Sequence, residues 1–280
     1  MIHTALDALT SPTLKHLREH WWGPDFTEFL VETLRPRPGN RILDVGCGTG
    51  TGELSIGRLH VSQIRLTGVD LVVENVQAAR QETASHNQRA AFAAGDACDL
   101  PFRDGVFDST FCVAVLQHVR DVEAALAEFA RVTMANGRVV VVEPDNAARY
   151  WYSSAPVGRE AFDASTRFFT ALAAARGERA DGKIGPQLPR LFAGHGIEAL
   201  DVRLFPVSQV QLGAPPETLW TERRTRVEHA LTHAPAAARP FGEELLETLG
   251  RYAAEAAAAG PSFVEIQLTM LFATVGQKTE

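Results

Sequence analysis

The sequence is poor in cysteine and has no long apolar run. Three cysteines, Cys47, Cys98 and Cys112, stand among 280 residues, and none forms a C-x-x-C pair, so no disulfide framework is predicted. No apolar stretch reaches the roughly 18 residues of a membrane-spanning helix, and the first residues lack the apolar core of a signal peptide. We therefore expect a cytoplasmic protein with reduced thiols and no membrane partner.

Basic residues are in the minority. The chain has 27 Lys and Arg against 34 Asp and Glu, which gives a net charge of −7. Proteins that bind a nucleic-acid backbone usually show the opposite balance, so no nucleic-acid partner is expected. The one local basic cluster, Arg223, Arg224 and Arg226, is interspersed with Glu222 and Glu228, which predicts a solvated helix face rather than a phosphate site.

Strand-like and helix-like segments alternate along the chain. Apolar runs of strand length occur at 41–46, 63–70, 89–97, 109–116 and 138–145, with helical patterns at 51–61, 73–87 and 121–132. Strands separated by helices form a parallel sheet with right-handed crossovers and helices on both faces. Further strands are expected at 197–212 and 263–276. We predict an α/β fold with a doubly wound, mostly parallel seven-stranded sheet.

The segment ILDVGCGTGTG, residues 42–52, combines a buried strand with a glycine-rich turn. Such a turn usually holds a nucleotide at the carboxyl end of a strand. The dinucleotide fingerprint G-x-G-x-x-G fails here, because its third position falls on Thr51 when counted from Gly46 and on Glu53 when counted from Gly48. A nicotinamide-dependent dehydrogenase is therefore disfavoured, and it stays the remaining alternative.

Several motifs in order resemble those of class I S-adenosylmethionine-dependent methyltransferases. Residues 44–50, DVGCGTG, resemble the first motif, an acidic residue followed by G-x-G-x-G. GVDL, AGDACDLPF, the segment 107–132 and NGRVVVVEPD resemble the later motifs of the ubiquinone-biosynthesis-type (methyltransferase type 11-like) branch. The resemblance covers 38–146 and, more weakly, 181–205. It implies a Rossmann-like methyltransferase fold and S-adenosylmethionine as cofactor, with S-adenosylhomocysteine as its product.

The resemblance also implies where the cofactor binds. Glycines without a Cβ let the backbone approach the amino-acid end of the cofactor, and an acidic residue after the second strand can accept hydrogen bonds from the ribose hydroxyls. Asp44, a carboxylate in a strand, is expected either to accept N–H groups of the glycine turn or to contact the cofactor ammonium. The predicted cofactor-binding residues are Asp44, Gly46, Cys47, Gly48, Gly50, Asp70, Leu71, Asp96, Ala97, Val113 and His118.

Two residues are candidates for a catalytic base. His118 is expected at the cleft and titrates near neutral pH, although a histidine there can equally support the cofactor or the loop. Glu143 ends the fifth strand at the same rim, where it can act as base, bind substrate or be an ordinary surface carboxylate. The segment His16–His20 matches H-x-x-E-H but offers no third ligand, so no metal is expected.

The segments outside the motifs are expected to build a substrate pocket. We predict an N-terminal helical lid segment over 1–38 and a methyltransferase domain over 39–280, with helical lid insertions near 147–180 and 213–260. Aromatic side chains in these segments can line an apolar pocket, or simply pack the helices on the sheet. The pocket candidates are Trp21, Trp22, Tyr150, Trp151, Tyr152 and Phe168.

These patterns predict a small-molecule methyltransferase. The expected reaction is in-line transfer of the methyl group to oxygen, then nitrogen, then carbon in order of preference, in a biosynthetic, natural-product pathway. RNA or protein methylation is one alternative, and a non-catalytic cofactor-binding protein or a cofactor-dependent cyclase is another. The expected partner is the small-molecule acceptor, and a homodimer is left open.

Overall fold

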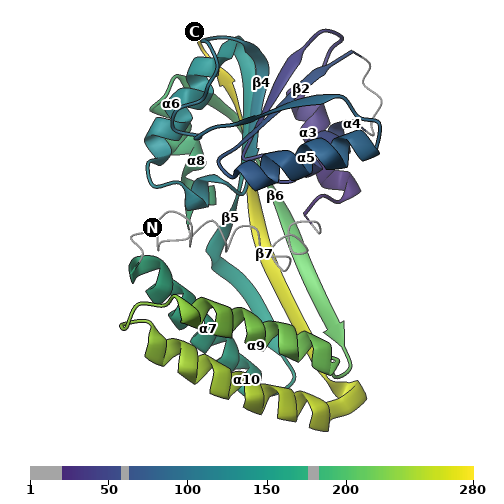
Figure 1. The fold of residues 1–280 in the computed structure, drawn as a ribbon, viewed down its shortest axis with the longest axis vertical. Helices are drawn as coiled ribbons and strands as arrows, with labels where there is room; N and C mark the ends of the chain where they lie inside the picture. The colour runs from purple at the N-terminus through teal and green to yellow at the C-terminus, as the bar shows by residue number, and fades with distance from the viewer. Residues whose placement is uncertain (1–20, 58–62, 176–182) are drawn as a thin grey trace. The chain divides into compact units, whose positions relative to one another are not determined.

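The computed structural model describes residues 21–57, 63–175 and 183–280 (Figure 1). The chain divides into two compact units. The first, here the sheet unit, holds the chain up to Asp145 together with Lys183–Phe205 and Leu271–Glu280, and the second, the helical unit, holds Asn146–Gly182 and Pro206–Met270. The division falls within three long strands, β5 (Thr133–Ser153), β6 (Ile197–Leu212) and β7 (Val264–Lys278).

The predicted seven-stranded, mostly parallel sheet is confirmed. Its strand order is β3-β2-β1-β4-β5-β7-β6, and the pairs β1–β2, β2–β3, β1–β4 and β4–β5 are parallel. The first four strands are β1 (Arg41–Val45), β2 (Arg65–Asp70), β3 (Ala90–Ala94) and β4 (Phe107–Val113). The chain turns from one side of β1 to the other after β3. The carboxyl ends of β1 and β4 therefore flank the switch point, which is where ligands bind in such sheets.

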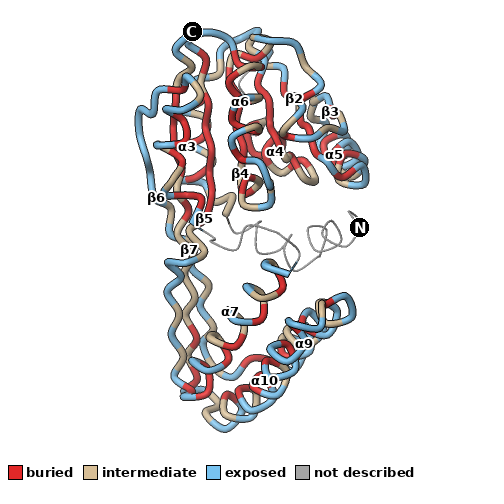
Figure 2. Tube along the Cα trace, turned by 90° about the vertical axis from the view of Figure 1, so that its left-hand side faces the viewer, coloured by how far each residue is buried: buried red, intermediate tan, exposed pale blue. Residues whose placement is uncertain are grey.

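Helices cover both faces of the sheet unit. On one face, α6 (Val122–Val132) and α8 (Ile184–Ala193) share a buried apolar cluster with strand residues such as Leu43 and Val141. On the other face, α5 (Val73–Ser85) packs its Val76 against Cys47. Helix α4 (Thr51–Gly57) follows β1 directly, and α3 (Pro24–Leu34) precedes it. Figure 2 shows buried residues concentrated along β4 and β5 in this unit, where Val139–Val142 are all fully buried.

Local sequence explains why α6 begins and which side it buries. Asp121 caps the helix, since its side chain accepts the N–H of Ala124 at 2.9 Å. The apolar residues that recur at helical spacing after it are the buried ones: Val122, Ala125, Leu126, Phe129 and Val132. The helix therefore packs against the sheet in the register that its sequence predicts.

The helical unit has an apolar core of its own. Its helices are α7 (Val157–Ala175), α9 (Glu217–Thr232) and α10 (Arg239–Ala259). They bury a cluster that includes Phe168, Leu172, Trp220, Leu245 and Tyr252. The expected helical insertions thus contain three long helices, while their role as a lid stays a prediction.

A buried ion pair crosses this core and corrects one expectation. Glu265 on β7 is 4% exposed. Its carboxylate accepts hydrogen bonds from both terminal nitrogens of Arg223, at 3.1 and 2.6 Å, and from the hydroxyl of Tyr252, at 2.6 Å. Burial raises the pKa of Glu265, but these donors outweigh it and the net shift is downward. Arg223 is therefore not part of a solvated helix face. The prediction was wrong at this residue because its partner lies on β7, 42 positions along the chain, and the residue spacing within α9 gives no sign of that partner.

Candidate functional site

The glycine turn lies at the carboxyl end of β1. Gly46, Gly48 and Gly50 have φ of +76°, +54° and +86°, a region that favours glycine. The N–H of Gly46 donates to the carbonyl of Val69 on β2 at 2.7 Å, so the turn folds over the neighbouring strand. A Cβ built on Gly46 would collide with the side chain of Val115, whereas one built on Gly48 meets open space. The turn is thus packed on one side and open at Gly48.

Asp70 at the end of β2 holds this turn. One carboxylate oxygen accepts the N–H of Gly48 at 2.8 Å. The other accepts the N–H of Val72 at 2.9 Å and the side-chain amide of Asn75 at 3.2 Å. A carboxylate offers about four acceptor positions, so Asp70 can fix the turn and still accept a further donor. The ribose role of Asp70 stays a prediction, and its turn-holding role is an addition to it.

Two more carboxylates are buried beneath the turn. Asp44 on β1 is 4% exposed and Glu53 on α4 is 1% exposed. Within the described residues, neither oxygen of Glu53 has a hydrogen-bond partner. Burial, with a contribution from Asp70, raises the pKa of Glu53 to about 8. Glu53 is therefore largely protonated at neutral pH.

Asp44 shares this electrostatic environment. Burial raises its pKa well above the usual value, and the charges of Glu53 and Asp70 raise it further. Among the described residues, no hydrogen bond joins Asp44 to the backbone of the glycine turn, so the structure does not support that half of the expectation. A site with buried carboxylates that resist ionisation favours a positively charged ligand group, because such a group stabilises the ionised form.

The turn after β4 lies directly against the glycine turn. Ala114 has φ of +59°, an unfavourable conformation for a residue with a Cβ, and it leads into the short 3₁₀ helix η1 (Leu116–His118). The fully buried Glu143 on β5 accepts the N–H groups of Val115 at 2.7 Å and of Leu116 at 2.6 Å through one oxygen. Glu143 therefore fixes the strained turn whose Val115 side chain contacts the glycine turn.

This geometry bears on both candidate bases. The second oxygen of Glu143 accepts the N–H of Gln117 at 3.4 Å, so both oxygens face backbone donors. A positioning role fits this arrangement better than proton abstraction, and the base role of Glu143 stays a prediction that the geometry does not favour. His118 ends η1, its side chain is exposed, and its backbone N–H donates to the carbonyl of Val115 at 2.9 Å. Its base role also stays a prediction.

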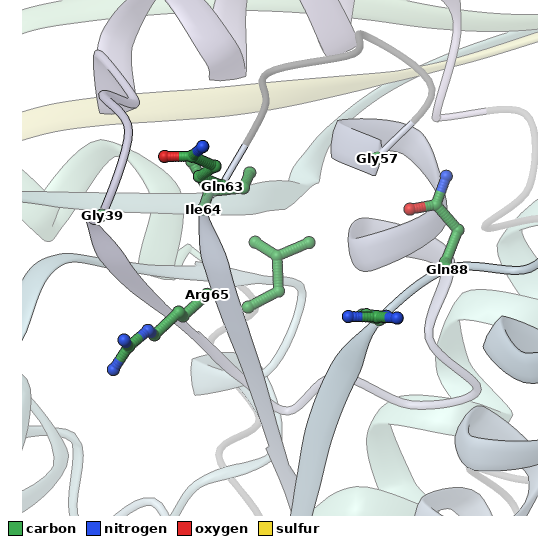
Figure 3. A pocket seen from close by; sticks show the side chains of 8 residues that line it. Gly39, Gly57, Gln63, Ile64, Arg65 and Gln88 are labelled. Atoms are coloured by element: carbon green, nitrogen blue, oxygen red, sulfur yellow. The ribbon is translucent and has the colours of Figure 1, made fainter.

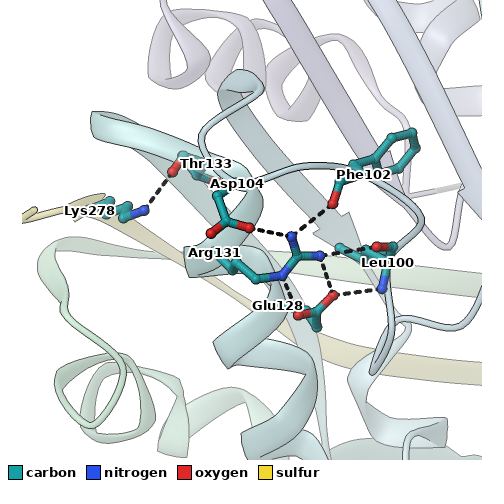
Figure 4. A network of polar contacts seen from close by, with 7 residues as sticks. All are labelled: Leu100, Phe102, Asp104, Glu128, Arg131, Thr133 and Lys278. Carbon is teal, nitrogen blue, oxygen red and sulfur yellow. Dashed lines mark hydrogen bonds and ion pairs between the residues drawn. The ribbon is translucent and has the colours of Figure 1, made fainter.

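The loop with the predicted cofactor residues Asp96 and Ala97 follows β3 and is held by hydrogen bonds. Asp96 accepts the N–H of Cys98 at 2.9 Å, and Ala97 is buried. Figure 4 shows Arg131 on α6 reaching the loop that comes next, where it donates to the carbonyls of Leu100 at 3.0 Å and Phe102 at 2.8 Å. Its partner Glu128 accepts the N–H of Leu100 at 2.7 Å. The loop that follows Asp96 is thereby tied to α6.

The remaining cofactor candidates lie beside these groups. Cys47 is buried in the glycine turn, and burial raises the pKa of its thiol. Leu71 follows Asp70 and is 54% exposed, and Val113 is the last residue of β4. All the predicted cofactor residues thus come from the carboxyl ends of β1 to β4 or from the loops and the 3₁₀ helix that follow them.

The aromatic pocket candidates belong to both units. In the sheet unit, Trp21 and Trp22 are half-buried before α3, and Trp22 lies edge-on to Phe26. In the helical unit, Phe168 is fully buried and Trp151 stacks on Phe162 at 5.4 Å, which is ordinary core packing. Tyr150 and Tyr152 are 56% and 46% exposed and remain the better candidates of that unit for contact with a ligand.

One hollow of the sheet unit lies at the opposite edge of the sheet. Figure 3 shows it lined by Gly39, Gly57, Gln63, Ile64, Arg65 and Gln88, next to the amino ends of β2 and β3. Ligands of parallel α/β sheets bind at the carboxyl ends, so this hollow is not the candidate site. In the described parts of the chain, no cluster of metal-ligating side chains was found, and no helix is long and apolar enough to cross a membrane. The segment His16–His20 lies outside the described residues.

Known proteins similar to this chain agree with the geometry. The methyltransferase domain family matches residues 43–141. An uncharacterized 37.1 kDa protein in transposon Tn4556 of Streptomyces fradiae is 31% identical over 89% of this chain and 66% of its own length. An O-methyltransferase of Penicillium expansum is 34% identical over 43% of this chain and 44% of its own length. The chain thus spans only part of these longer proteins.

A solved structure whose name states an activity has a similar fold. The crystal structure of the [4+2]-cyclase SpnF matches with a TM-score of 0.55 at 20% identity, over 91% of this chain and 80% of that one. At this level of identity the likeness concerns the fold alone.

Glu53 predicts a pH dependence of stability. Its pKa is about 8 in the folded chain against a usual 4.5, so its contribution to stability is full below pH 4.5 and is lost as pH rises to about 8. Unfolding by urea, measured from pH 5 to 9, should show this fall. Glu53→Gln, which cannot ionise, should show a smaller fall, because only Asp44 still contributes to it, and should be more stable than the native chain at pH 9. An equal slope in both proteins would contradict the assignment.

Glu143→Gln should destabilise the chain even without ligand. The amide has one acceptor oxygen instead of two, and its NH₂ group would face the backbone donors of the strained turn. The expected loss is about 1–3 kcal/mol in the free energy of unfolding by urea. The exposed control Glu74→Gln should stay within about 0.5 kcal/mol. If Glu143→Gln were as stable as the native chain, the carboxylate would not hold the turn.

Proposed function

We propose that this chain, which belongs to the class I S-adenosylmethionine-dependent methyltransferases, transfers a methyl group from S-adenosylmethionine to a small-molecule acceptor. The observation that carries the proposal is the hydrogen bond from Gly48 to Asp70 within a left-handed glycine turn. It joins the carboxyl ends of β1 and β2 at the edge where nucleotide ligands bind. The match of residues 43–141 to the methyltransferase domain family supports the same reading.

The residues present suit the cofactor. The turn is open at Gly48, so the backbone can be approached there. Asp70 retains acceptor capacity for a ribose hydroxyl while it holds the turn. The buried Asp44, whose pKa is raised by burial and by Glu53, suits the cationic amino-acid end. The proposed cofactor residues are those of the glycine turn, namely Gly46, Cys47, Gly48 and Gly50, together with Asp44, Asp70, Leu71, Asp96, Ala97, Val113 and His118.

The chain's own contribution to the reaction is placement. The bound cofactor supplies a sulfonium that already carries the activated methyl group. The protein must hold the acceptor atom in line with that group and exclude water, and well-oriented reactants gain on the order of 7–11 kcal/mol. A base is needed only if the acceptor must lose a proton. For such an acceptor we propose the exposed His118, because Glu143 is occupied by backbone donors.

We propose oxygen as the first choice of acceptor atom, then nitrogen, then carbon. The Penicillium expansum relative is an O-methyltransferase, and this supports oxygen. The acidic charge balance counts against RNA as the acceptor. The fold of SpnF shows that this architecture also serves a cyclase, so methyl transfer rests on the site residues and not on the fold.

Calorimetric titration of the full chain tests the proposal. S-adenosylmethionine and S-adenosylhomocysteine should bind and NAD should not. Asp70→Ala should weaken the binding of both by at least about tenfold, which corresponds to about 1.4 kcal/mol. Asp108→Ala is the matched control. That carboxylate also accepts a backbone N–H, from Arg41 at 2.8 Å, but at the amino edge of the sheet.

The control should bind both cofactor forms as the native chain does. Binding of NAD alone would overturn the proposal. Equal weakening by both substitutions would mean that Asp70 acts only through general stability, and the proposed cofactor site would have to be abandoned.

A further inference from the structure

Five of the eight arginines that the structure describes in the helical unit form an ion pair with a carboxylate. The ion pairs are Arg159–Asp163, Arg167–Glu244, Arg223–Glu265, Arg224–Glu217 and Arg251–Glu160. Arg149, Arg226 and Arg239 differ, because within the described residues no ion pair joins any of them to a carboxylate. Of these three, Arg149 and Arg226 act on each other electrostatically. The printed hydrogen bond of Arg149 goes to a neutral amide, the Oδ1 of Asn146, at 2.6 Å. The guanidinium of Arg226 lies over the ring of Phe169, 4.9 Å from its centroid.

Arg149 projects from the face of β5 that packs against α7. Arg149 and Trp151 are two residues apart on this strand, so they project from the same face. Trp151 stacks on Phe162 of α7. Phe169, whose ring lies beneath the guanidinium of Arg226, is seven residues further along α7 than Phe162. It is therefore on the same side of that helix as Phe162. Arg149 and Arg226 thus both belong to the part of the helical unit that packs on α7, and the charge of Arg149 acts on Arg226.

The electrostatics of this pair are unfavourable as they stand. Both residues are exposed at the surface, yet nearby protein atoms partly shield them from water, and this lowers the pKa of both groups. The positive charge of Arg149 lowers the pKa of Arg226 further. Two like charges that repel each other and lack a carboxylate are stabilised by any anion that reaches both. Guanidinium groups match the geometry of carboxylate and phosphate through paired N–H donors.

We propose that Arg149 and Arg226 form an anion-binding site with Phe169 as its aromatic floor, and that it takes the carboxylate or phosphate group of a small molecule with an apolar or aromatic body. The site lies within the helical unit, and its binding of an anion does not depend on the proposed function.

Aromatic anions test the site on the full chain. Benzoate and phenyl phosphate serve as probes, and benzyl alcohol is the neutral control, in calorimetric titrations at low salt. At least one anion should bind the native chain more tightly than benzyl alcohol does, and the tighter one identifies the preferred group. Arg149→Gln and Arg226→Gln should each weaken that binding at least tenfold. Arg224→Gln, on the same helix and paired with Glu217, should leave it unchanged.

Arg226→Lys provides a variant that keeps the charge and therefore the electrostatics of the fold. It should still bind the anion several-fold more weakly, because a lysine lacks the paired donors. The proposal would be overturned if neither anion bound better than benzyl alcohol, or if all the arginine variants bound the anion as the native chain does.

Titration with S-adenosylhomocysteine separates this proposal from the proposed function. Arg149→Gln and Arg226→Gln should bind S-adenosylhomocysteine as the native chain does but should no longer bind the aromatic anion. This result would support both proposals. If the native chain bound an anion but no S-adenosylhomocysteine, the proposed function would fail and the anion site would stand. The reverse result would overturn the anion site alone.

Discussion

The hydrogen bond between the N–H of Gly48 and Asp70 is the contact on which the candidate site depends. It fixes a turn in which three glycines have positive φ, and it joins the ends of β1 and β2. The same carboxylate accepts the N–H of Val72 at the start of α5. One side chain thus determines where the turn, the strand end and the next helix meet. The side chain of Val115 packs against the glycine turn at Gly46, and Glu143 fixes the backbone of Val115.

Buried carboxylates give this site its electrostatic character. Glu143 is stabilised by backbone donors, whereas Glu53 has none within the described residues and is largely protonated near neutral pH. Burial, Glu53 and Asp70 all raise the pKa of Asp44. Such a cluster stores unfavourable energy that a cationic ligand group can relieve. The helical unit shows the complement, a pair of arginines suited to an anion.

The sequence predicted the elements better than the contacts between them. The helical pattern over 121–132 located α6, and the glycine spacing located the turn, because both depend on residues close together in the chain. In the sequence, Glu53 stood out only because it occupies a position where the dinucleotide fingerprint requires glycine. The hold of Glu143 on the β4 turn and the pairing of Arg223 with Glu265 escaped prediction. These contacts join residues 28 and 42 positions apart, and no local pattern encodes such partners.

The most direct measurement follows backbone amide resonances of the full chain by nuclear magnetic resonance during titration with S-adenosylhomocysteine. The account predicts that the signals of Gly46, Gly48 and Gly50 shift, with saturation at a common concentration, while those of Gly39 and Gly57 at the opposite hollow stay in place. Shifts confined to Gly39 and Gly57, or none at the glycine turn, would contradict the placement of the cofactor at the carboxyl edge of the sheet.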